Sequence, residues 1–241
     1  MTLEGRTVLI TGGARRIGRS LALAVARAGG DVILHYGTSQ LEAESAGREI
    51  EALGRRAILL QADLAEAEQA AGLVARAAGH GPLYALVNNA AIFEDLDWQS
   101  TGVEAWNRHL QINLTAPFLL GQAFARALPP GESGRIVNLL DWRALRPGPD
   151  HLPYTVSKAA LTALTRSLAA ALAPQISVNG LALGAVLPPG DRASTEGLLD
   201  RVPAGRWARL EEVDQALIFL LDGPAYITGE ILQVDGGRHL A

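Results

Sequence analysis

Short apolar segments rich in Val, Ile and Leu alternate with longer segments rich in Ala, Leu, Glu and Arg along this chain of 241 residues. The short segments have the length and composition of strands buried on both faces of a sheet, and the longer ones repeat with helical period. Strands joined in turn by helices form a parallel sheet that is covered on both sides. The sequence therefore predicts a doubly wound α/β fold of about seven strands.

The same alternation gives the expected boundaries. We expect strands near residues 6–11, 31–36, 56–60, 83–88, 134–140, 176–181 and 231–234. We expect helices near residues 16–28, 40–53, 66–79, 103–128, 154–173 and 211–222, with a short one near 195–201. No linker, repeat or low-complexity run divides the chain, so we expect one domain over residues 1–241. Periodicity is interrupted at Leu187-Pro188-Pro189-Gly190-Asp191, which predicts a surface loop and a substrate lid near 187–205.

Charge and composition limit the partners of the chain. The formal net charge is −4 and the basic residues do not cluster, which argues against a nucleic-acid partner. Cysteine is absent, and the five histidines show no metal-ligand spacing, so we expect no disulfide and no metal site. No apolar stretch reaches the roughly 18 residues of a spanning helix, and no signal peptide is recognisable. We therefore expect a cytoplasmic protein that acts on small molecules and does not bind membranes.

A glycine-rich segment, Thr11-Gly12-Gly13-Ala14-Arg15-Arg16-Ile17-Gly18, directly follows the first expected strand and precedes a helical run. Glycine permits a tight turn and a close approach of the backbone to a pyrophosphate, whose charge is favoured by a helix N-terminus. Ordinary strand-to-helix turns also contain glycine, but the strand before and the helix after favour a nucleotide. The segment predicts a dinucleotide site.

The end of the second strand bears on the choice between NAD and NADP. Sites that prefer NAD usually place Asp or Glu about 20 residues downstream, where it binds the ribose 2′-hydroxyl. The segment Leu34-His35-Tyr36-Gly37-Thr38-Ser39 contains no carboxylate that would repel a 2′-phosphate. Thr38 and Ser39 can donate hydrogen bonds to phosphate, or alternatively cap the next helix. With positive charge available from Arg15 or Arg16, the sequence predicts NADPH.

Lys158 is the only lysine among the 21 Lys and Arg residues, and Tyr154 lies four positions before it. On a helix the two side chains share one face. A tyrosine has an ordinary pKa near 10, which is too high for efficient proton exchange at neutral pH, and a nearby ammonium group lowers that pKa. The spacing predicts an acid–base pair in which Tyr154 donates the proton in a reduction; the alternative is an accidental surface pair.

Several segments together resemble the short-chain dehydrogenase/reductase family, and the resemblance spans nearly the whole chain. They are the glycine loop, Asn88-Asn89-Ala90-Ala91, Asn113, Tyr154-Thr155-Val156-Ser157-Lys158, Tyr226-Ile227-Thr228-Gly229 and Val234-Asp235-Gly236-Gly237. The resemblance implies a Rossmann-type sheet with an added seventh strand and a homotetramer. It also implies that the lysine holds the nicotinamide ribose and that Asn113 orders a proton-relay water.

Three positions depart from the common family pattern and look like the branch of pteridine and dihydromonapterin reductases. Arg16 replaces the middle glycine, which implies contact with cofactor phosphate and pterin. Asp141 replaces the usual serine, and Phe93 stands where that branch places an aromatic against the pterin. A carboxyl group can exchange protons with a ring nitrogen, but an ionised Asp141 would raise the pKa of Tyr154 and oppose Lys158. Alternatively, Asp141 is a turn residue and Phe93 a core aromatic.

Taken together, the residues and the resemblance define the expected site. We expect the dinucleotide to contact Gly12, Arg15, Arg16, Ile17, Gly18, Tyr36, Thr38, Ser39, Asp63, Leu64, Asn89, Ala90, Lys158, Gly184 and Val186. We expect the substrate to contact Arg16, Phe93, Asp141 and Tyr154, and catalysis to depend on Asn113, Asp141, Tyr154 and Lys158. Asp63 resembles the family residue that touches adenine, and a lone surface acid is the alternative.

The resulting hypothesis is reduction of a C=N bond in a dihydropterin or dihydrofolate, with the hydride from NADPH and the proton from Tyr154. One alternative is a general carbonyl reductase of the same family, such as a reductase of 3-oxoacyl thioesters or ketones. A second is a catalytically silent NADPH sensor, because a fold does not fix a function; the intact Tyr154–Lys158 pair argues against it.

Overall fold

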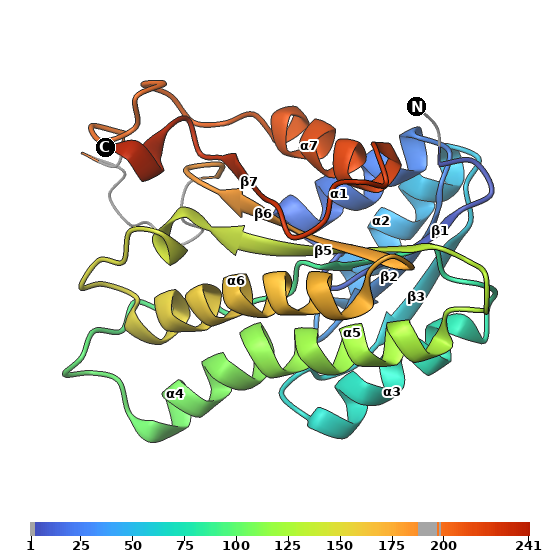
Figure 1. Cartoon of the computed structure of the whole chain (residues 1–241), viewed down its shortest axis with the longest axis horizontal. Helices are drawn as coiled ribbons and strands as arrows, with labels where there is room; N and C mark the ends of the chain where they lie inside the picture. Colours follow the sequence, from blue (N-terminus) through green and yellow to red (C-terminus); the bar gives the residue numbers. More distant parts are fainter. Residues whose placement is uncertain (1–2, 188–196, 198) are drawn as a thin grey trace.

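The computed structural model describes residues 3–187, 197 and 199–241, and it contains a seven-stranded sheet within these residues (Figure 1). The strand order is β3-β2-β1-β4-β5-β6-β7, and every neighbouring pair is parallel. The strands are β1 (Thr7–Ile10), β2 (Asp31–Tyr36), β3 (Ala57–Gln61), β4 (Ala85–Asn88), β5 (Gly134–Asp141), β6 (Ile176–Leu183) and β7 (Ile231–Val234). The predicted fold class is confirmed.

Helices cover both faces of the sheet. They are α1 (Arg16–Arg27), α2 (Gln40–Ala52), α3 (Ala67–Ala78), α4 (Val103–Leu110), α5 (Ala116–Ala127), α6 (Leu152–Leu172) and α7 (Leu210–Asp222). Helices α1, α2 and α7 lie on one face, and α3 to α6 on the other (Figure 1). None of the helices within the described residues is both long enough and apolar enough to cross a membrane.

The strand order reverses between β1 and β4, because β2 and β3 continue to one side and β5 to β7 to the other. In open parallel sheets, a crevice forms at such a point outside the carboxyl ends of the strands, where the two loops leave in opposite directions. The glycine-rich turn after β1 and the segment after β4 meet there through direct hydrogen bonds. The topology thus places the predicted dinucleotide site at this crevice.

The structure differs from the predicted boundaries mainly in one helix. The expected helix over 103–128 is divided, because Gln111–Thr115 form a turn of π-helix between α4 and α5. Such turns insert one extra residue and are frequent at functional sites. The short helix expected near 195–201 is not found in its described part, because Gly197 and residues 199–201 form turns; residues 195, 196 and 198 lie outside the described residues. About half of the lid expected near 187–205, residues 188–196 and 198, also lies outside them. The single-domain division stays a prediction.

Each face of the sheet has its own apolar core. Leu86 of β4 is fully buried and packs in the core that α3 and α5 cover. We expect Leu86→Ala to lower the free energy of unfolding by about 2–5 kcal/mol, since lost burial and a residual cavity add. Urea unfolding followed by circular dichroism measures the change. The control is Leu41→Ala, whose side chain is 77% exposed; a similar loss in both variants would contradict the assigned core.

Candidate active site

The glycine-rich turn between β1 and α1 is packed so closely that it admits no larger side chain at two positions. Gly12 has a φ of +62°, and a Cβ on Gly18 would lie 2.1 Å from the carbonyl oxygen of Gly12. Helix α1 begins at Arg16, and the preceding Arg15 makes no side-chain capping hydrogen bond. An anion is favoured at the N-terminus of a helix by the helix dipole and by the backbone N–H groups of its first turn. The turn fits a pyrophosphate.

The segment after β4 supports this turn. The side-chain amide of Asn89 donates to the carbonyl oxygens of Thr11, at 2.8 Å, and Gly12, at 3.1 Å. The backbone N–H groups of Asn89 and Ala90 both donate to the hydroxyl of Thr11, each at 3.0 Å. The structure therefore brings Asn89 and Ala90 to the glycine loop, where they hold its shape.

The residues expected near the adenosine half of the cofactor lie at the ends of β2 and β3. Tyr36 ends β2, Thr38 is exposed, and Ser39 precedes α2 without making a side-chain capping hydrogen bond. The capping alternative therefore fails for Ser39. The carboxylate of Asp63 is exposed and accepts a hydrogen bond from the N–H of Ala65 at 2.9 Å, so a turn-forming role is also present there.

Four further predicted cofactor residues frame the site. The side chain of Leu64 is 5% exposed and packs in the core beside Asp63. Ile17 is partly buried in the first turn of α1. At the end of β6, a Cβ on Gly184 would lie 2.6 Å from the Cα of Asp235, so only glycine fits there, and Val186 is buried.

Tyr154 and Asp141 are joined by a hydrogen bond at the carboxyl end of β5. The Tyr154 hydroxyl, in the first turn of α6, donates to Oδ2 of Asp141 at 3.1 Å. The other carboxylate oxygen of Asp141 accepts the N–H of Arg143 at 2.9 Å, so this aspartate is also a turn residue. Lys158 donates from Nζ to the carbonyl oxygen of Leu139 at 2.7 Å. Tyr154 and Lys158 are 8% and 3% exposed, so they are not a surface pair.

Burial dominates the electrostatics of this group. It raises the pKa of Tyr154 well above 10.0, and the charge and hydrogen bond of Asp141 raise that pKa further. Of the two opposing effects expected from the sequence, the raising of the Tyr154 pKa by Asp141 therefore outweighs a lowering by Lys158. The Lys158 Nζ bonds to a carbonyl and lies 5.7 Å from the centre of the Tyr154 ring. Burial also raises the pKa of Asp141, although Arg143 and Tyr154 oppose this, and lowers the pKa of Lys158 to about 8.

Phe93 lies beside Tyr154 on the open side of the site. Its ring contacts the Tyr154 ring edge-on, with centroids 4.6 Å apart, and it stacks on His151 at 4.0 Å. The side chain is 51% exposed, which rules out the alternative of a core aromatic. An exposed aromatic face next to a buried proton donor is suited to a flat, conjugated substrate.

Asn113 lies in the π-helical turn and is fully buried. Its amide nitrogen donates to the carbonyl oxygen of Ile92 at 3.0 Å and to the Ser157 hydroxyl at 3.1 Å, and its oxygen accepts the N–H of Ile92 at 2.9 Å. The side chain thus joins the segment before Phe93 to α6. Its predicted contact with a relay water stays a prediction.

Sequence reasoning missed three side chains that border the site. Arg143 lies 3.8 Å from Asp141 and 3.0 Å from Asp150 as an ion pair, with its guanidinium 5.7 Å from the centre of the Phe93 ring. His151 stacks on Phe93, and His35 contacts the glycine loop. The only sequence signal among them is the polar His35, which directly follows the apolar residues Val32, Ile33 and Leu34 of its strand.

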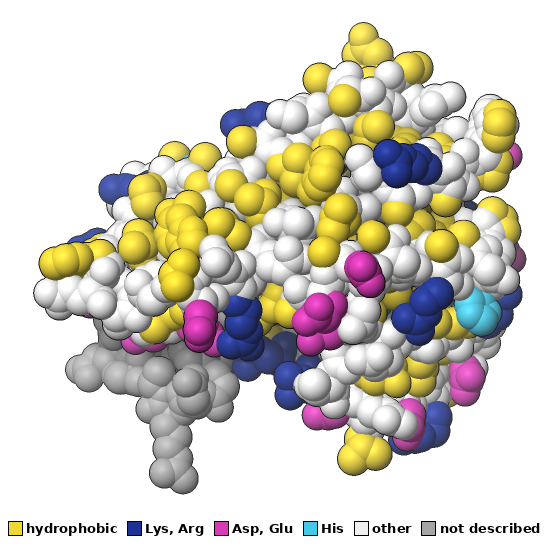
Figure 2. Space-filling view, turned by 90° about the horizontal axis from the view of Figure 1, so that it is seen from below, with side chains coloured by type: hydrophobic (Ala, Val, Ile, Leu, Met, Phe, Trp, Pro, Cys, Tyr) yellow, Lys and Arg dark blue, Asp and Glu magenta, His cyan; other side chains and the backbone are white. Residues whose placement is uncertain are grey.

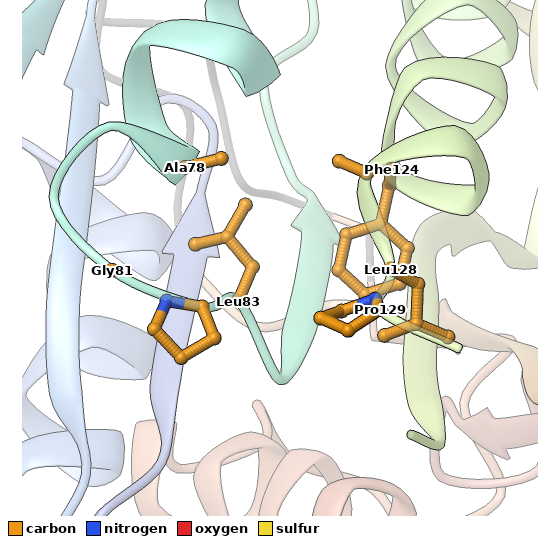
Figure 3. Close-up of a pocket in the computed structure, with 8 residues that line it drawn as sticks. Ala78, Gly81, Leu83, Phe124, Leu128 and Pro129 are labelled. Atoms are coloured by element: carbon orange, nitrogen blue, oxygen red, sulfur yellow. The ribbon is translucent and has the colours of Figure 1, made fainter. Parts of the chain in front are cut away.

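A separate cavity of about 320 Å³ lies away from these residues (Figure 3). It is lined by Ala78, Gly81, Pro82, Leu83, Phe124, Ala127, Leu128 and Pro129, none of which is ionisable. Leu83 precedes β4, so the cavity is at the amino ends of the strands, whereas Tyr154 lies at the carboxyl ends. The lining of this cavity therefore offers no side chain for acid–base chemistry.

Comparisons with known proteins agree with this geometry. Residues 12–239 match the family model described as enoyl-(acyl carrier protein) reductase. A 3-oxoacyl-[acyl-carrier-protein] reductase of Synechocystis sp. is 32% identical over 240 residues, which are 98% of this chain and 97% of that protein. The chain belongs to the short-chain dehydrogenase/reductase family and is an oxidoreductase.

Two solved structures are similar over the whole chain. The FolM alternative dihydrofolate reductase 1 of Brucella canis, complexed with NADP, has a TM-score of 0.92 and 36% identity, with 100% of this chain and 97% of that chain covered. A short-chain dehydrogenase of Burkholderia cenocepacia, in complex with NADP, has a TM-score of 0.93 and 36% identity, with 99% of each chain covered. Family membership, as predicted from the sequence, is confirmed.

The close packing of the glycine loop gives a direct test of the site. We expect Gly18→Ala to force the loop apart and to raise the Kd for NADPH by at least about tenfold, because the new Cβ has no room beside Gly12 and Asn89. The fluorescence of bound NADPH measures the Kd. Gly72→Ala is the control, since nothing lies within 4 Å of the added Cβ; equal binding by both variants would show that the loop is not the binding site.

Proposed function

We propose that the protein is an NADPH-dependent reductase of a dihydropterin or dihydrofolate-type C=N bond. The observation that carries the proposal is the hydrogen bond between Tyr154 and Asp141 beside the exposed ring of Phe93. A carboxyl group next to the tyrosine suits protonation of a ring nitrogen, and the aromatic ring suits a bicyclic substrate. The similarity to a FolM alternative dihydrofolate reductase supports the same substrate class.

The cofactor would lie in the crevice between the glycine loop and the segments after β4 and β6. Its pyrophosphate would be held by the loop and the N-terminus of α1 around Gly12, Ile17 and Gly18, with Arg15 and Arg16 adding charge. Tyr36, Thr38, Ser39, Asp63, Leu64, Asn89, Ala90, Gly184 and Val186 would complete the site. When bound, NADPH supplies the hydride. Solved relatives in complex with NADP support this choice of cofactor.

The two buried acids would deliver the proton together. The raised pKa of Tyr154 makes a free phenolate unfavourable, so the tyrosine needs to regain a proton as it gives one up. Asp141 also has a raised pKa and lies within hydrogen-bonding distance. The step requires a protonated Asp141 that donates to the phenolic oxygen, which is the reverse of the hydrogen bond in the structure. The Tyr154 hydrogen then passes to the substrate nitrogen while the Asp141 proton passes to the phenolic oxygen. The negative charge then rests on Asp141, near the guanidinium of Arg143.

Lys158 would hold the cofactor. With a pKa of about 8, it is mostly cationic at pH 7, and its Nζ is fixed by the carbonyl of Leu139. Arg16 adopts a left-handed backbone conformation with a φ of 51° at the start of α1, where its side chain could serve both phosphate and pterin. Asn113 would act through the segment that carries Phe93.

A general carbonyl reductase is the second candidate. The similarity to a 3-oxoacyl-[acyl-carrier-protein] reductase favours it. It would need a proton from Tyr154 on the carbonyl oxygen and a hydrogen bond to that oxygen, and for this hydrogen bond Asp141 offers no advantage over a hydroxyl side chain. The two candidates therefore differ in whether the carboxyl group is required.

The proposal includes a cytoplasmic location and a homotetramer. Figure 2 shows the face of the molecule seen from below Figure 1, where hydrophobic side chains cover broad areas and charged side chains of both signs are scattered. Val103 on α4 and Phe118 on α5 are exposed, at 71% and 38%. Such apolar helix surface is what a second copy could cover.

A substrate panel tests the reaction. We expect the protein to oxidise NADPH with 7,8-dihydrofolate or 7,8-dihydrobiopterin faster than with a 3-oxoacyl thioester, followed as loss of absorbance at the nicotinamide band. Tyr154→Phe should lower kcat by at least about 10²-fold while the Kd for NADPH changes little, since it removes only the proton donor. Tyr226→Phe, at a fully exposed tyrosine, is the control. Turnover of the thioester but of no pterin would favour the second candidate.

The role of Asp141 predicts a pH dependence. Its carboxyl donates the proton only when protonated, so the rate with a dihydropterin should fall as pH rises through the pKa of Asp141, which lies above 3.8. Asp141→Asn should lower kcat by about 10²-fold or more and remove this dependence. Asp150→Asn, which also loses a contact to Arg143 but none to Tyr154, is the control. Equal rates for wild type and Asp141→Asn at pH 5 and pH 8 would refute the relay.

A further inference from the structure

His35 is a buried polar side chain that the proposed reaction does not use. It is the fifth residue of β2, a strand whose interior is otherwise Val, Ile and Leu, and it is 2% exposed. A buried polar group is retained at low cost only where it is hydrogen-bonded. Its partners therefore show what it does.

The ring of His35 bridges two loops at the edge of the crevice. Its Nδ1 accepts the N–H of Gly12 at 3.1 Å, and its Nε2 lies 3.1 Å from the carbonyl oxygen of Ala62, just after β3. The N–H of Gly13 donates to the backbone carbonyl of the same histidine at 3.0 Å. Two successive N–H groups of the glycine loop are thus tied to one residue of β2.

These two ring contacts are compatible with one protonation state. A backbone N–H requires an unprotonated Nδ1, and a carbonyl oxygen requires a hydrogen on Nε2. Only the neutral Nε2–H tautomer satisfies both. In the imidazolium form, the hydrogen on Nδ1 would face the N–H of Gly12, and that contact would become a donor facing a donor.

The surroundings of His35 favour the neutral form. Burial lowers its pKa from 6.5, and Arg76 on α3 lowers the pKa further; the carbonyl of Ala62 and the carboxylate of Asp63 act in the opposite sense. At neutral pH the bond to Gly12 is therefore intact. The bond is lost as the pH falls through the pKa of His35 in the folded protein, which lies below 6.5.

We infer that His35 is a positioning residue for the cofactor, which holds the glycine loop in its pyrophosphate-binding shape only while its imidazole is neutral. The inference rests on the proposed binding of NADPH. Gly12 is at a positive φ and its carbonyl is already engaged by Asn89, so the His35 bond fixes the remaining polar group of that residue. Its loss would free the loop to leave the conformation in which its backbone approaches a pyrophosphate.

Three substitutions separate the two ring contacts. In His35→Asn, the amide oxygen can take the place of Nδ1 and accept from Gly12, without titrating. In His35→Gln, the longer side chain reaches the position of Nε2 and can donate to Ala62. His35→Leu retains neither contact. His80→Asn, at an exposed histidine outside the crevice, is the matched control.

The test measures the Kd for NADPH by fluorescence titration from pH 8 to pH 4.5, with thermal unfolding as the check on folding. At pH 8 we expect His35→Leu and His35→Gln to raise the Kd by about tenfold and His35→Asn by less than about threefold. The saturated kcat should change little in any of them. As the pH falls, the Kd of the wild type should rise relative to that of His35→Asn, by up to tenfold per pH unit below the pKa.

Each outcome decides the question. If His35→Gln binds like wild type, or His35→Asn binds as weakly as His35→Leu, the bond to Gly12 does not position the loop. A constant ratio of wild-type to His35→Asn Kd over a pH range in which NMR titration shows the His35 ring becoming protonated overturns the requirement for a neutral ring. If His35→Leu does not fold, the comparison of Asn with Gln still decides. Failure of the wild type itself to bind NADPH at pH 8 overturns the proposed cofactor, and with it this inference.

Discussion

The hydrogen bond between Tyr154 and Asp141 is the interaction on which the proposed chemistry of this protein depends. It joins the last residue of β5 to the first turn of α6, and it is formed where both groups are largely shielded from water. In water such a bond would be weak and the carboxyl would ionise at its ordinary pKa. Burial changes both, because it penalises the charged forms of the phenol and the carboxyl alike. Burial therefore raises the pKa of both groups, so that each keeps its proton to a higher pH than it would in water.

Shielding has a cost that the surrounding residues reduce. Lys158 is buried with its ammonium group on the carbonyl of Leu139, and its pKa falls to about 8. The folded protein therefore disfavours the cationic form of Lys158 relative to water. As a result, the free energy of unfolding decreases as the pH falls from 10.5 through about 8, because the lysine becomes protonated in the unfolded chain before it does in the folded one. Ionisable groups whose pKa values are shifted by burial are frequent at functional sites. Arg143 offsets part of the cost of burying the ionised Asp141, because its backbone N–H donates to the carboxylate and its guanidinium carries the opposite charge.

The sequence predicts the sheet, its strand boundaries and the position of the crevice, because the alternation of apolar strands and amphipathic helices leaves few ways to bury every element. The spacing of Tyr154 and Lys158 predicts that they share a helix face, and they do. The opposing effects of Lys158 and Asp141 on the pKa of Tyr154 are visible in the sequence, but which one wins is not, because it depends first on the depth of burial. Phe93 was recognised only through a family resemblance, while its contacts with His151 arise from the loop conformation.

Both halves of the crevice contain a side chain whose protonation state is influenced by burial. At the dinucleotide end, His35 must be neutral to accept from Gly12 and donate to Ala62. At the substrate end, the proposed step requires Asp141 to carry a hydrogen that replaces the one released by Tyr154. Acid favours the second requirement and opposes the first. Under these two requirements, a reductase works best at a pH above the pKa of His35. The pH must also not exceed the pKa of Asp141 by so much that its carboxyl group is rarely protonated. The burial of His35 and the burial of Asp141 together set the pH range in which cofactor binding and proton delivery coexist.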